Sequence, residues 1–254
     1  MSRRFDLSGR AAFVTGGGGG LGRMAAQTLA GAGASVALVA RTAEKVEAAA
    51  EAVRAAGGRA LAIAADVLDR AAIRAAMNRT EAELGPIDIL VNNAGVTSPK
   101  PLLDLTEADW DRIVDTSMKG AFLCTQEAAP RMIARGRGRI VNMGSILSAR
   151  AVTARAAYAA AKAGLLNFTR AAAVELGPHG ITVNALGPTV IVTDLNREMV
   201  RAQPGLYAGI TGRTPLGRLG ETADLEGPLL FLASDASAFV TGQILFVDGG
   251  YTAT

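Results

Sequence analysis

The chain has 254 residues, half of them hydrophobic, and 26 basic against 23 acidic side chains leave a formal net charge of +3. This length is typical of one soluble domain. The chain has one cysteine, Cys124, and one histidine, His179. Zinc sites built from these residue types and nucleophiles activated by histidine are therefore nearly excluded, and we expect no metal site. A lone cysteine forms no internal disulfide and the first ten residues lack the apolar core of a signal peptide, so we expect a cytoplasmic protein.

The positive charge does not indicate a nucleic-acid-binding protein. The sequence isoelectric point is about 9.3, but the 22 arginines and 4 lysines are scattered over the chain and aromatic residues make up only 4%. Nucleic-acid-binding proteins concentrate basic charge on one face and interleave it with aromatic residues. The longest uncharged run, residues 24–40, contains several glycines and polar residues, so it does not predict a membrane span.

Short apolar runs alternate with longer helical patterns along the chain. The expected strands are residues 11–14, 35–39, 60–64, 87–91, 139–142, 181–184 and 244–247. The expected helices are residues 21–32, 43–56, 71–84, 107–135, 156–176 and 223–233. Strict alternation predicts a doubly wound, Rossmann-like α/β fold, with about seven parallel strands and helices on both faces. We expect a single domain over residues 1–254, with residues 189–215 as a loop long enough to be a substrate lid.

A glycine-rich turn follows the first expected strand and leads into the first expected helix, over residues 15–22. Glycines allow the backbone to approach a pyrophosphate closely, and the free N–H groups of a helix start attract its charge. In this position the turn predicts a dinucleotide site more strongly than a merely flexible turn. The residues expected to contact the cofactor here are Thr15, Gly16, Gly20, Leu21 and Gly22.

The end of the second strand indicates which dinucleotide binds. An acidic residue about twenty residues beyond the glycine turn would hold the 2′-hydroxyl of NAD. Instead the sequence has Arg41 and Thr42, and a guanidinium suits a 2′-phosphate. We therefore expect NADP(H) as cofactor in preference to NAD(H); the alternative is that Arg41 is a solvated residue at a helix start.

Reduction of a carbonyl by hydride requires a proton donor, and Tyr158 is the best candidate. Of the three tyrosines, only Tyr158 has a lysine one helical turn further on, Lys162. The two side chains share a helix face, and a nearby ammonium favours the phenolate and lowers the tyrosine pKa. The alternative is a partly buried tyrosine with a lysine that extends to solvent. Ser145 follows the fifth expected strand and the run 92–95 follows the fourth, so both lie at the carboxyl edge of the sheet, where such folds bind ligands.

With these motifs the whole chain resembles the short-chain dehydrogenase/reductase family. The resemblance rests on T-G-x-x-x-G-x-G at 15–22, Asp-Val at 66–67, N-N-A-G at 92–95, Ser145, Y-x-x-x-K at 158–162 and V-D-G-G at 247–250. It implies that Tyr158 is the general acid/base, that Lys162 lowers the tyrosine pKa and holds the nicotinamide ribose, and that Ser145 polarises the substrate carbonyl. The further cofactor contacts that it implies are Asp66, Val67, Asn93, Ala94, Gly95, Pro188, Thr189, Ile191 and Thr193. It also implies a homo-oligomer, commonly a tetramer.

The sequence departs from the family pattern at two positions. Ser117 stands where the family usually has a catalytic asparagine, which leaves two alternatives: a hydroxyl that still binds a relay water, or one that bonds back to its own helix. Thr189 replaces the usual glycine after Pro188. The resemblance implies an oxidoreductase acting on a small ketone or secondary alcohol, of the sugar-acid or polyol kind or the 3-oxoacyl kind. Arg150 is either an anchor for an anionic substrate or a surface residue. The rival interpretation is an NADP(H)-binding sensor with little turnover.

Overall fold

The computed structural model describes residues 3–254, without the side chain of Leu206. A seven-stranded sheet runs through the centre of the molecule, and every neighbouring pair of strands is parallel. Its order is β3-β2-β1-β4-β5-β6-β9, which is the doubly wound arrangement predicted. The strands are β1 (Ala11–Thr15), β2 (Ser35–Ala40), β3 (Arg59–Ala64), β4 (Ile87–Asn92), β5 (Gly138–Met143), β6 (Ile181–Pro188) and β9 (Ile244–Val247).

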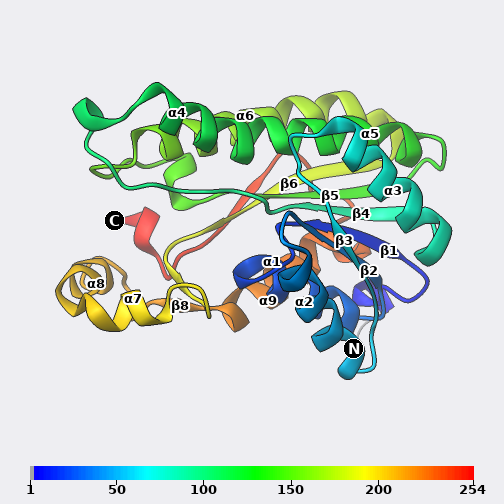
Figure 1. Cartoon of the computed structure of the whole chain (residues 1–254), viewed down its shortest axis with the longest axis horizontal. Coiled ribbons are helices and arrows are strands. Elements are labelled where there is room, and N and C mark those ends of the chain that lie inside the picture. The colour runs from blue at the N-terminus through cyan, green and yellow to red at the C-terminus, as the bar shows by residue number, and fades with distance from the viewer. Residues whose placement is uncertain (1–2) are drawn as a thin grey trace.

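Helices cover both faces of this sheet, as Figure 1 shows. One face packs on α1 (Gly20–Gly31), α2 (Ala43–Ala55) and α9 (Thr222–Ala233). The other packs on α3 (Arg70–Leu84), α5 (Gly120–Ile133) and α6 (Ala156–Leu176). The central strands β1, β4 and β5 are buried along their full length, because a parallel sheet enclosed by helices has no face toward water. Their sequences accordingly do not alternate between apolar and polar residues, although β4 and β5 also bury Asp88, Asn92, Arg139 and Asn142.

The fourth expected helix, residues 107–135, is divided in the structure. It consists of α4 (Glu107–Val114), a π-helical turn over Asp115–Lys119, and α5. A π turn inserts an extra residue into the helix and is frequent at functional sites. Ser117 lies in the middle of this turn and is buried. The prediction of one continuous helix was therefore wrong at the position where the sequence departs from the family pattern.

The segment expected to be an irregular lid, residues 189–215, contains regular structure. It includes β7 (Ile191–Val192), α7 (Arg197–Ala202) and α8 (Pro204–Thr211), and β7 pairs with β8 (Gly220–Glu221). Figure 1 shows α7 and α8 at one end of the molecule, beyond the carboxyl edge of the sheet. Single 3-10 turns lie at Arg3–Phe5, Leu102–Asp104, Ile146–Ser148, Gly177–His179, Asp235–Ser237 and Tyr251–Ala253. Within residues 3–254, no helix is long and apolar enough to cross a membrane.

Candidate active site

The glycine turn between β1 and α1 has the backbone that its sequence predicts. Gly16 and Gly20 have φ angles of +66° and +51°, a region that side chains with a Cβ rarely adopt. A Cβ built on Gly22 would lie 2.1 Å from the carbonyl oxygen of Gly16, and one built on Gly16 would lie 2.8 Å from Nδ2 of Asn93. These glycines leave backbone exposed where a phosphate group would fit, so the turn suits a dinucleotide.

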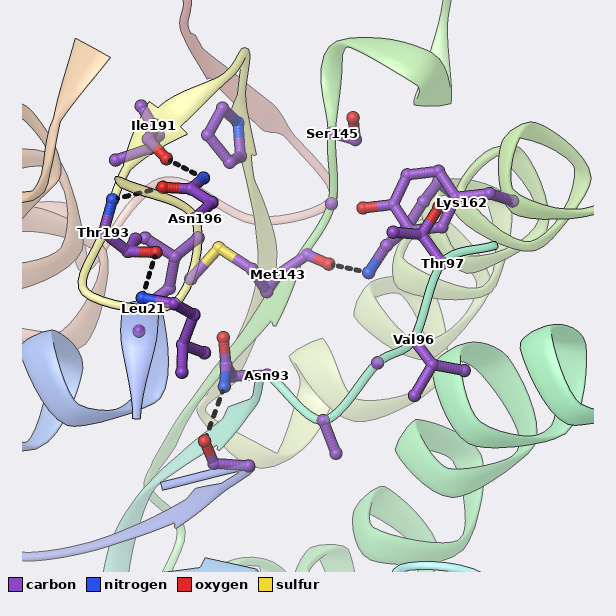
Figure 2. A pocket seen from close by; sticks show the side chains of 18 of the residues that line it. Leu21, Asn93, Val96, Thr97, Met143, Ser145, Lys162, Ile191, Thr193 and Asn196 are labelled. Atoms are coloured by element: carbon purple, nitrogen blue, oxygen red, sulfur yellow. Dashed lines mark hydrogen bonds between the residues drawn. The ribbon is translucent and has the colours of Figure 1, made fainter. Parts of the chain in front are cut away.

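Thr15 and Asn93 connect the ends of β1 and β4 beneath this turn. The backbone N–H groups of Asn93 and Ala94 donate to Thr15 Oγ1 at 3.0 and 3.1 Å. Asn93 Nδ2 donates to the carbonyl oxygens of Thr15 and Gly16 at 3.0 and 3.2 Å, one of which is drawn in Figure 2. The asparagine thus holds the glycine turn in place.

Two neighbouring cavities lie along the carboxyl edge of the sheet. The tyrosine cavity, of about 330 Å³, contains Tyr158, Lys162 and Ser145. The arginine cavity, of about 220 Å³, contains Arg41 and Thr42. Most of the predicted cofactor residues line one or both: Gly16, Gly20, Leu21, Asn93, Ala94, Gly95, Pro188, Thr189, Ile191 and Thr193 the first, and Gly16, Asp66, Val67, Ala94 and Gly95 the second. Thr15 and Gly22 line neither cavity: Thr15 supports the turn through its hydroxyl and its carbonyl oxygen, and Gly22 lies against the backbone of Gly16.

The arginine cavity contains a second cation that sequence reasoning missed. Lys45 lies in the first turn of α2 and lines the same cavity as Arg41, which precedes the helix. Its Cβ is 3.2 Å from the position of a Cβ built on Gly18, which places it against the glycine turn. No local pattern pairs the two cations, because Arg41 lies before the extended N-cap Thr42 and the i, i+4 rule applies only within a helix.

Ser145, Tyr158 and Lys162 come together at the tyrosine cavity from two elements. Ser145 begins the 3-10 turn after β5, while Tyr158 and Lys162 stand on one face of α6. Lys162 is buried, and its Nζ donates to the carbonyl oxygen of Met143 at 2.6 Å, as Figure 2 shows. The same Nζ is 5.5 Å from the centre of the Tyr158 ring. The resemblance-based triad is thus assembled around one cavity.

The pKa values differ from the expectation for the tyrosine. Burial raises the pKa of Tyr158 above its usual range, although the Ser145 hydroxyl and the positive charge of Arg155 act in the opposite direction. Burial also lowers the pKa of Lys162 to about 8. The expected lowering of the Tyr158 pKa by Lys162 is therefore not found, because desolvation outweighs the favourable contacts of the phenolate.

The Ser117 hydroxyl lies beside the lysine of this triad. A Cβ built on Gly95 would be 3.3 Å from Ser117 Oγ and 3.7 Å from Lys162 Nζ. Ser117 is buried, and its hydroxyl has no hydrogen-bond partner among residues 3–254. The alternative in which it bonds back to its own helix is therefore not what the structure shows. The hydroxyl therefore lies near Gly95, at the same part of the site as Lys162.

Arg150 does not reach into the tyrosine cavity. It is exposed, and its guanidinium donates to the carbonyl oxygen of Thr252 near the carboxyl end of the chain. The surface alternative therefore fits the structure. Among residues 3–254, no group of three or more histidine, cysteine, aspartate and glutamate side chains is placed to hold a metal ion.

Comparisons with known proteins agree with this geometry. Residues 17–252 match the family model described as enoyl-(acyl carrier protein) reductase. Gluconate 5-dehydrogenase of Gluconobacter oxydans (strain 621H) is 40% identical over 98% of this chain and 96% of the relative. The 3-oxoacyl-[acyl-carrier-protein] reductase of Staphylococcus aureus (strain Mu50) is 38% identical over 95% of this chain and 97% of the relative.

Solved structures show the same similarity in three dimensions. A gluconate 5-dehydrogenase from Burkholderia cenocepacia J2315, in complex with NADP and tartrate, has a TM-score of 0.94 and 41% identity, covering 99% of this chain and 98% of the other. Because both the family model and these relatives span nearly the whole chain, the protein belongs to the short-chain dehydrogenase/reductase family and is an NAD(P)(H)-dependent oxidoreductase that interconverts a ketone and a secondary alcohol.

Proposed function

We propose that this enzyme is an NADP(H)-dependent dehydrogenase of sugar acids, and that Ser145, Tyr158 and Lys162 carry out its proton chemistry. The observation that carries the proposal is the meeting of these three side chains at one cavity. That cavity adjoins the glycine turn and the arginine cavity, so the reacting groups lie at one end of a dinucleotide-sized site.

The residues of the triad have complementary roles in the proposed reaction. A bound NADPH would supply the hydride for the carbonyl carbon. The Tyr158 phenol donates its proton to the carbonyl oxygen as negative charge develops there, and it accepts the proton in the reverse direction. Ser145 donates a hydrogen bond to the same oxygen, which polarises the carbonyl. The Lys162 ammonium stabilises the phenolate left after proton transfer.

The preference for NADP(H) is supported by the two cations of the arginine cavity, Arg41 and Lys45. A 2′-phosphate is doubly negative over most of the physiological range, and two adjacent cations favour it over a hydroxyl. We expect Arg41→Ala and Lys45→Ala each to raise the NADPH dissociation constant by about tenfold. This corresponds to a loss of roughly 1.4 kcal/mol of binding free energy. The NADH dissociation constant should stay unchanged. Titration calorimetry with both cofactors checks this, and equal weakening of the two would contradict it.

The sugar-acid substrate is supported by two observations. Several similar proteins bear gluconate in their names, and one of them was crystallised with the dicarboxylic acid tartrate. In this chain the positive charge of Arg155 acts on Tyr158. Its Nη1 is buried without a hydrogen-bond partner in the described part of the chain. A guanidinium nitrogen that lacks a partner in the described chain can pair with an anion, which supports a substrate that carries a carboxylate. The second candidate, a 3-oxoacyl thioester, is supported by the staphylococcal reductase.

The first experiment is NADPH oxidation with 5-ketogluconate, a neutral ketohexose and a 3-oxoacyl thioester, with Tyr158→Phe assayed in parallel. We expect turnover with the keto acid that is abolished in the variant. Arg155→Gln should raise KM for the keto acid about tenfold with little change for the neutral ketose, because only the former carries a carboxylate. Turnover restricted to the thioester would overturn the sugar-acid proposal in favour of the second candidate.

We further propose that residues 1–254 act as one domain, in which residues 189–215 form a lid over the site. The enzyme works as a homotetramer in a reducing cytoplasm. The buried free thiol of Cys124 supports the location, since a buried thiol that has no partner cysteine is suited to a reducing compartment.

A further inference from the structure

The lid contacts the glycine turn through a carboxylate. Asp194 Oδ1 accepts a hydrogen bond from the backbone N–H of Gly20 at 3.1 Å. Its second oxygen, Oδ2, is 3.0 Å from Arg23 Nη2, a cation on the first turn of α1. Backbone N–H groups at a helix start and a nearby guanidinium are the partners that a phosphate group uses. The carboxylate therefore takes up the contacts that the turn would offer to a pyrophosphate.

The neighbouring lid residue covers the rest of the turn. The Leu195 side chain lies 3.4 and 3.0 Å from the positions of Cβ atoms built on Gly19 and Gly20. Leu195 lines both the tyrosine cavity and the arginine cavity. A dinucleotide that fills both cavities must pass its pyrophosphate between them. Leu195 therefore stands at that crossing point.

The local backbone fixes this part of the lid in place. The N–H of Thr193 donates to Asn196 Oδ1 at 2.7 Å, and Asn196 Nδ2 donates to the carbonyl oxygen of Ile191 at 2.8 Å. The N–H of Leu195 donates to Thr193 Oγ1 at 3.3 Å. Figure 2 shows Thr193, Asn196 and Ile191 clustered on one side of the cavity. This closed turn presents Asp194 and Leu195 to the glycines as one unit.

We propose that Asp194 and Leu195 form a plug over the pyrophosphate position at the glycine turn, so that the lid must move before NADP(H) binds. The proposal rests on the proposed NADP(H) function of the site. A pyrophosphate beside the Asp194 carboxylate would bring like charges together, which is unfavourable. Displacement of Asp194 removes this repulsion and frees both the Gly20 N–H and Arg23. Asp194 therefore competes with the cofactor and sets its apparent affinity.

The test is direct measurement of cofactor binding to Asp194→Asn. This substitution keeps an oxygen that can accept from Gly20 but removes the charge, so folding should be unaffected; Asp194→Ala removes both contacts. We expect the NADPH dissociation constant, measured by nucleotide fluorescence, to fall about fivefold or more in both variants. Only molecules with an open lid bind NADPH, so a closed lid in part of the population lowers the apparent affinity. A substitution that favours the open lid therefore raises the apparent affinity. The association rate, measured by stopped flow, should rise in parallel.

Two controls make the result specific. Adenosine 2′-monophosphate has no pyrophosphate, so its dissociation constant should be the same in the wild type and the Asp194 variants. Glu198→Gln removes a negative charge from α7, where Glu198 pairs with Arg201, and should leave NADPH binding unchanged. Unchanged or weaker NADPH binding in both Asp194 variants, with tight binding to the wild type, would overturn the plug alone. Failure of the wild type to bind NADPH would overturn the proposed function and the plug with it.

Discussion

Lys162 is a buried cation whose protonation depends on the fold. In the unfolded chain its pKa is near 10.5, whereas burial lowers it to about 8 in the folded protein. Between these values the unfolded chain binds more protons, so stability rises with pH. Below pH 8 the folded protein holds Lys162 in its charged form, and the difference between the two pKa values then lowers the free energy of unfolding by on the order of 3 kcal/mol. Replacing Lys162 also removes the hydrogen bond from Nζ to Met143, and this loss destabilises the variant at every pH.

We therefore expect the stability difference between Lys162→Met and the wild type to depend on pH. The variant should gain most relative to the wild type below pH 8 and lose this advantage progressively toward pH 10. Urea unfolding of the cofactor-free proteins at pH 7 and pH 9.5 measures the difference. A gap that is the same at both pH values would show that the folded lysine keeps its ordinary pKa.

Ser117 gives a second prediction at the residue scale. Its buried hydroxyl has no partner in the described chain and adjoins Gly95 and Lys162. An asparagine at this position places an amide in the same space, so we expect Ser117→Asn to keep or raise kcat. Steady-state assays against Ser117→Ala, which removes the hydroxyl, isolate the polar contribution. A loss of turnover of more than about tenfold in Ser117→Asn, equal to roughly 1.4 kcal/mol, would show that the site has diverged from a simple relay.

The individual site residues were not equally predictable from the sequence. Tyr158, Lys162 and Ser145 were found because their spacing places them on one helix face and at one sheet edge. Asp194 and Leu195 were missed because their contact with Gly20 depends on how the lid folds back, which no local pattern encodes. The direction of the Tyr158 pKa shift was also missed. Desolvation is a property of the packed site, while the lysine spacing shows only the opposing effect.

At the scale of elements, Glu127 joins α3 to α5. Arg74 donates to both of its carboxylate oxygens at 3.0 Å, and Arg70 Nη1 is 3.4 Å from Oε1. The hydrogen bonds from Arg74 lower the pKa of Glu127 against the effect of burial. Because the folded pKa lies below the unfolded value of 4.5, this contribution to stability is present above pH 4.5 and is lost as the pH falls through the folded pKa.

We expect Glu127→Gln to destabilise the protein by about 1–2 kcal/mol at neutral pH. This is less than a fully buried pair would lose, because both arginines remain partly solvated. The matched control is Glu83→Gln, which breaks an exposed pair with Arg79 and should change stability by less than about 0.5 kcal/mol. Urea unfolding at pH 7 and pH 4 measures both variants. A Glu127→Gln deficit that persists undiminished at pH 4 would contradict the electrostatic explanation.

The predicted elements agree with the structure wherever burial controls the pattern. Strands such as β1 and β4 appear as apolar runs because they are enclosed on both sides. The π turn at Asp115–Lys119 was not predicted because its composition is as helical as that of its neighbours. The π turn differs from its neighbours in its backbone hydrogen-bond register. Its end also packs closely against another segment of the chain, since a Cβ built on Gly120 would lie 2.7 Å from a methyl group of Val67. Likewise, α7 and α8 were hidden because each is short.

At the scale of the whole molecule, several large apolar side chains are exposed, and two groups of them are candidate contacts between chains. One group is Trp110 on α4 and Phe122 on α5, which are 41% and 40% exposed. Phe239 and Leu245 belong to the other, at β9, which is an edge strand of the sheet. Exposed apolar patches on a folded chain indicate contacts with other chains. Two different surfaces that each self-associate about a two-fold axis would build the proposed tetramer.

The two-surface model predicts that one substitution halves the assembly. We expect the wild type to sediment as a tetramer at micromolar concentration and Phe239→Asp to sediment as a dimer, because the charge disrupts the β9 surface and leaves the α4–α5 surface intact. Leu68→Asp, at an exposed apolar residue that directly follows Val67 of the arginine cavity, is the matched control and should remain a tetramer. Analytical ultracentrifugation distinguishes these states. A wild-type monomer would exclude the assembly, while a Phe239→Asp monomer would show that the α4–α5 contact forms only after the β9 contact and that the two surfaces act together.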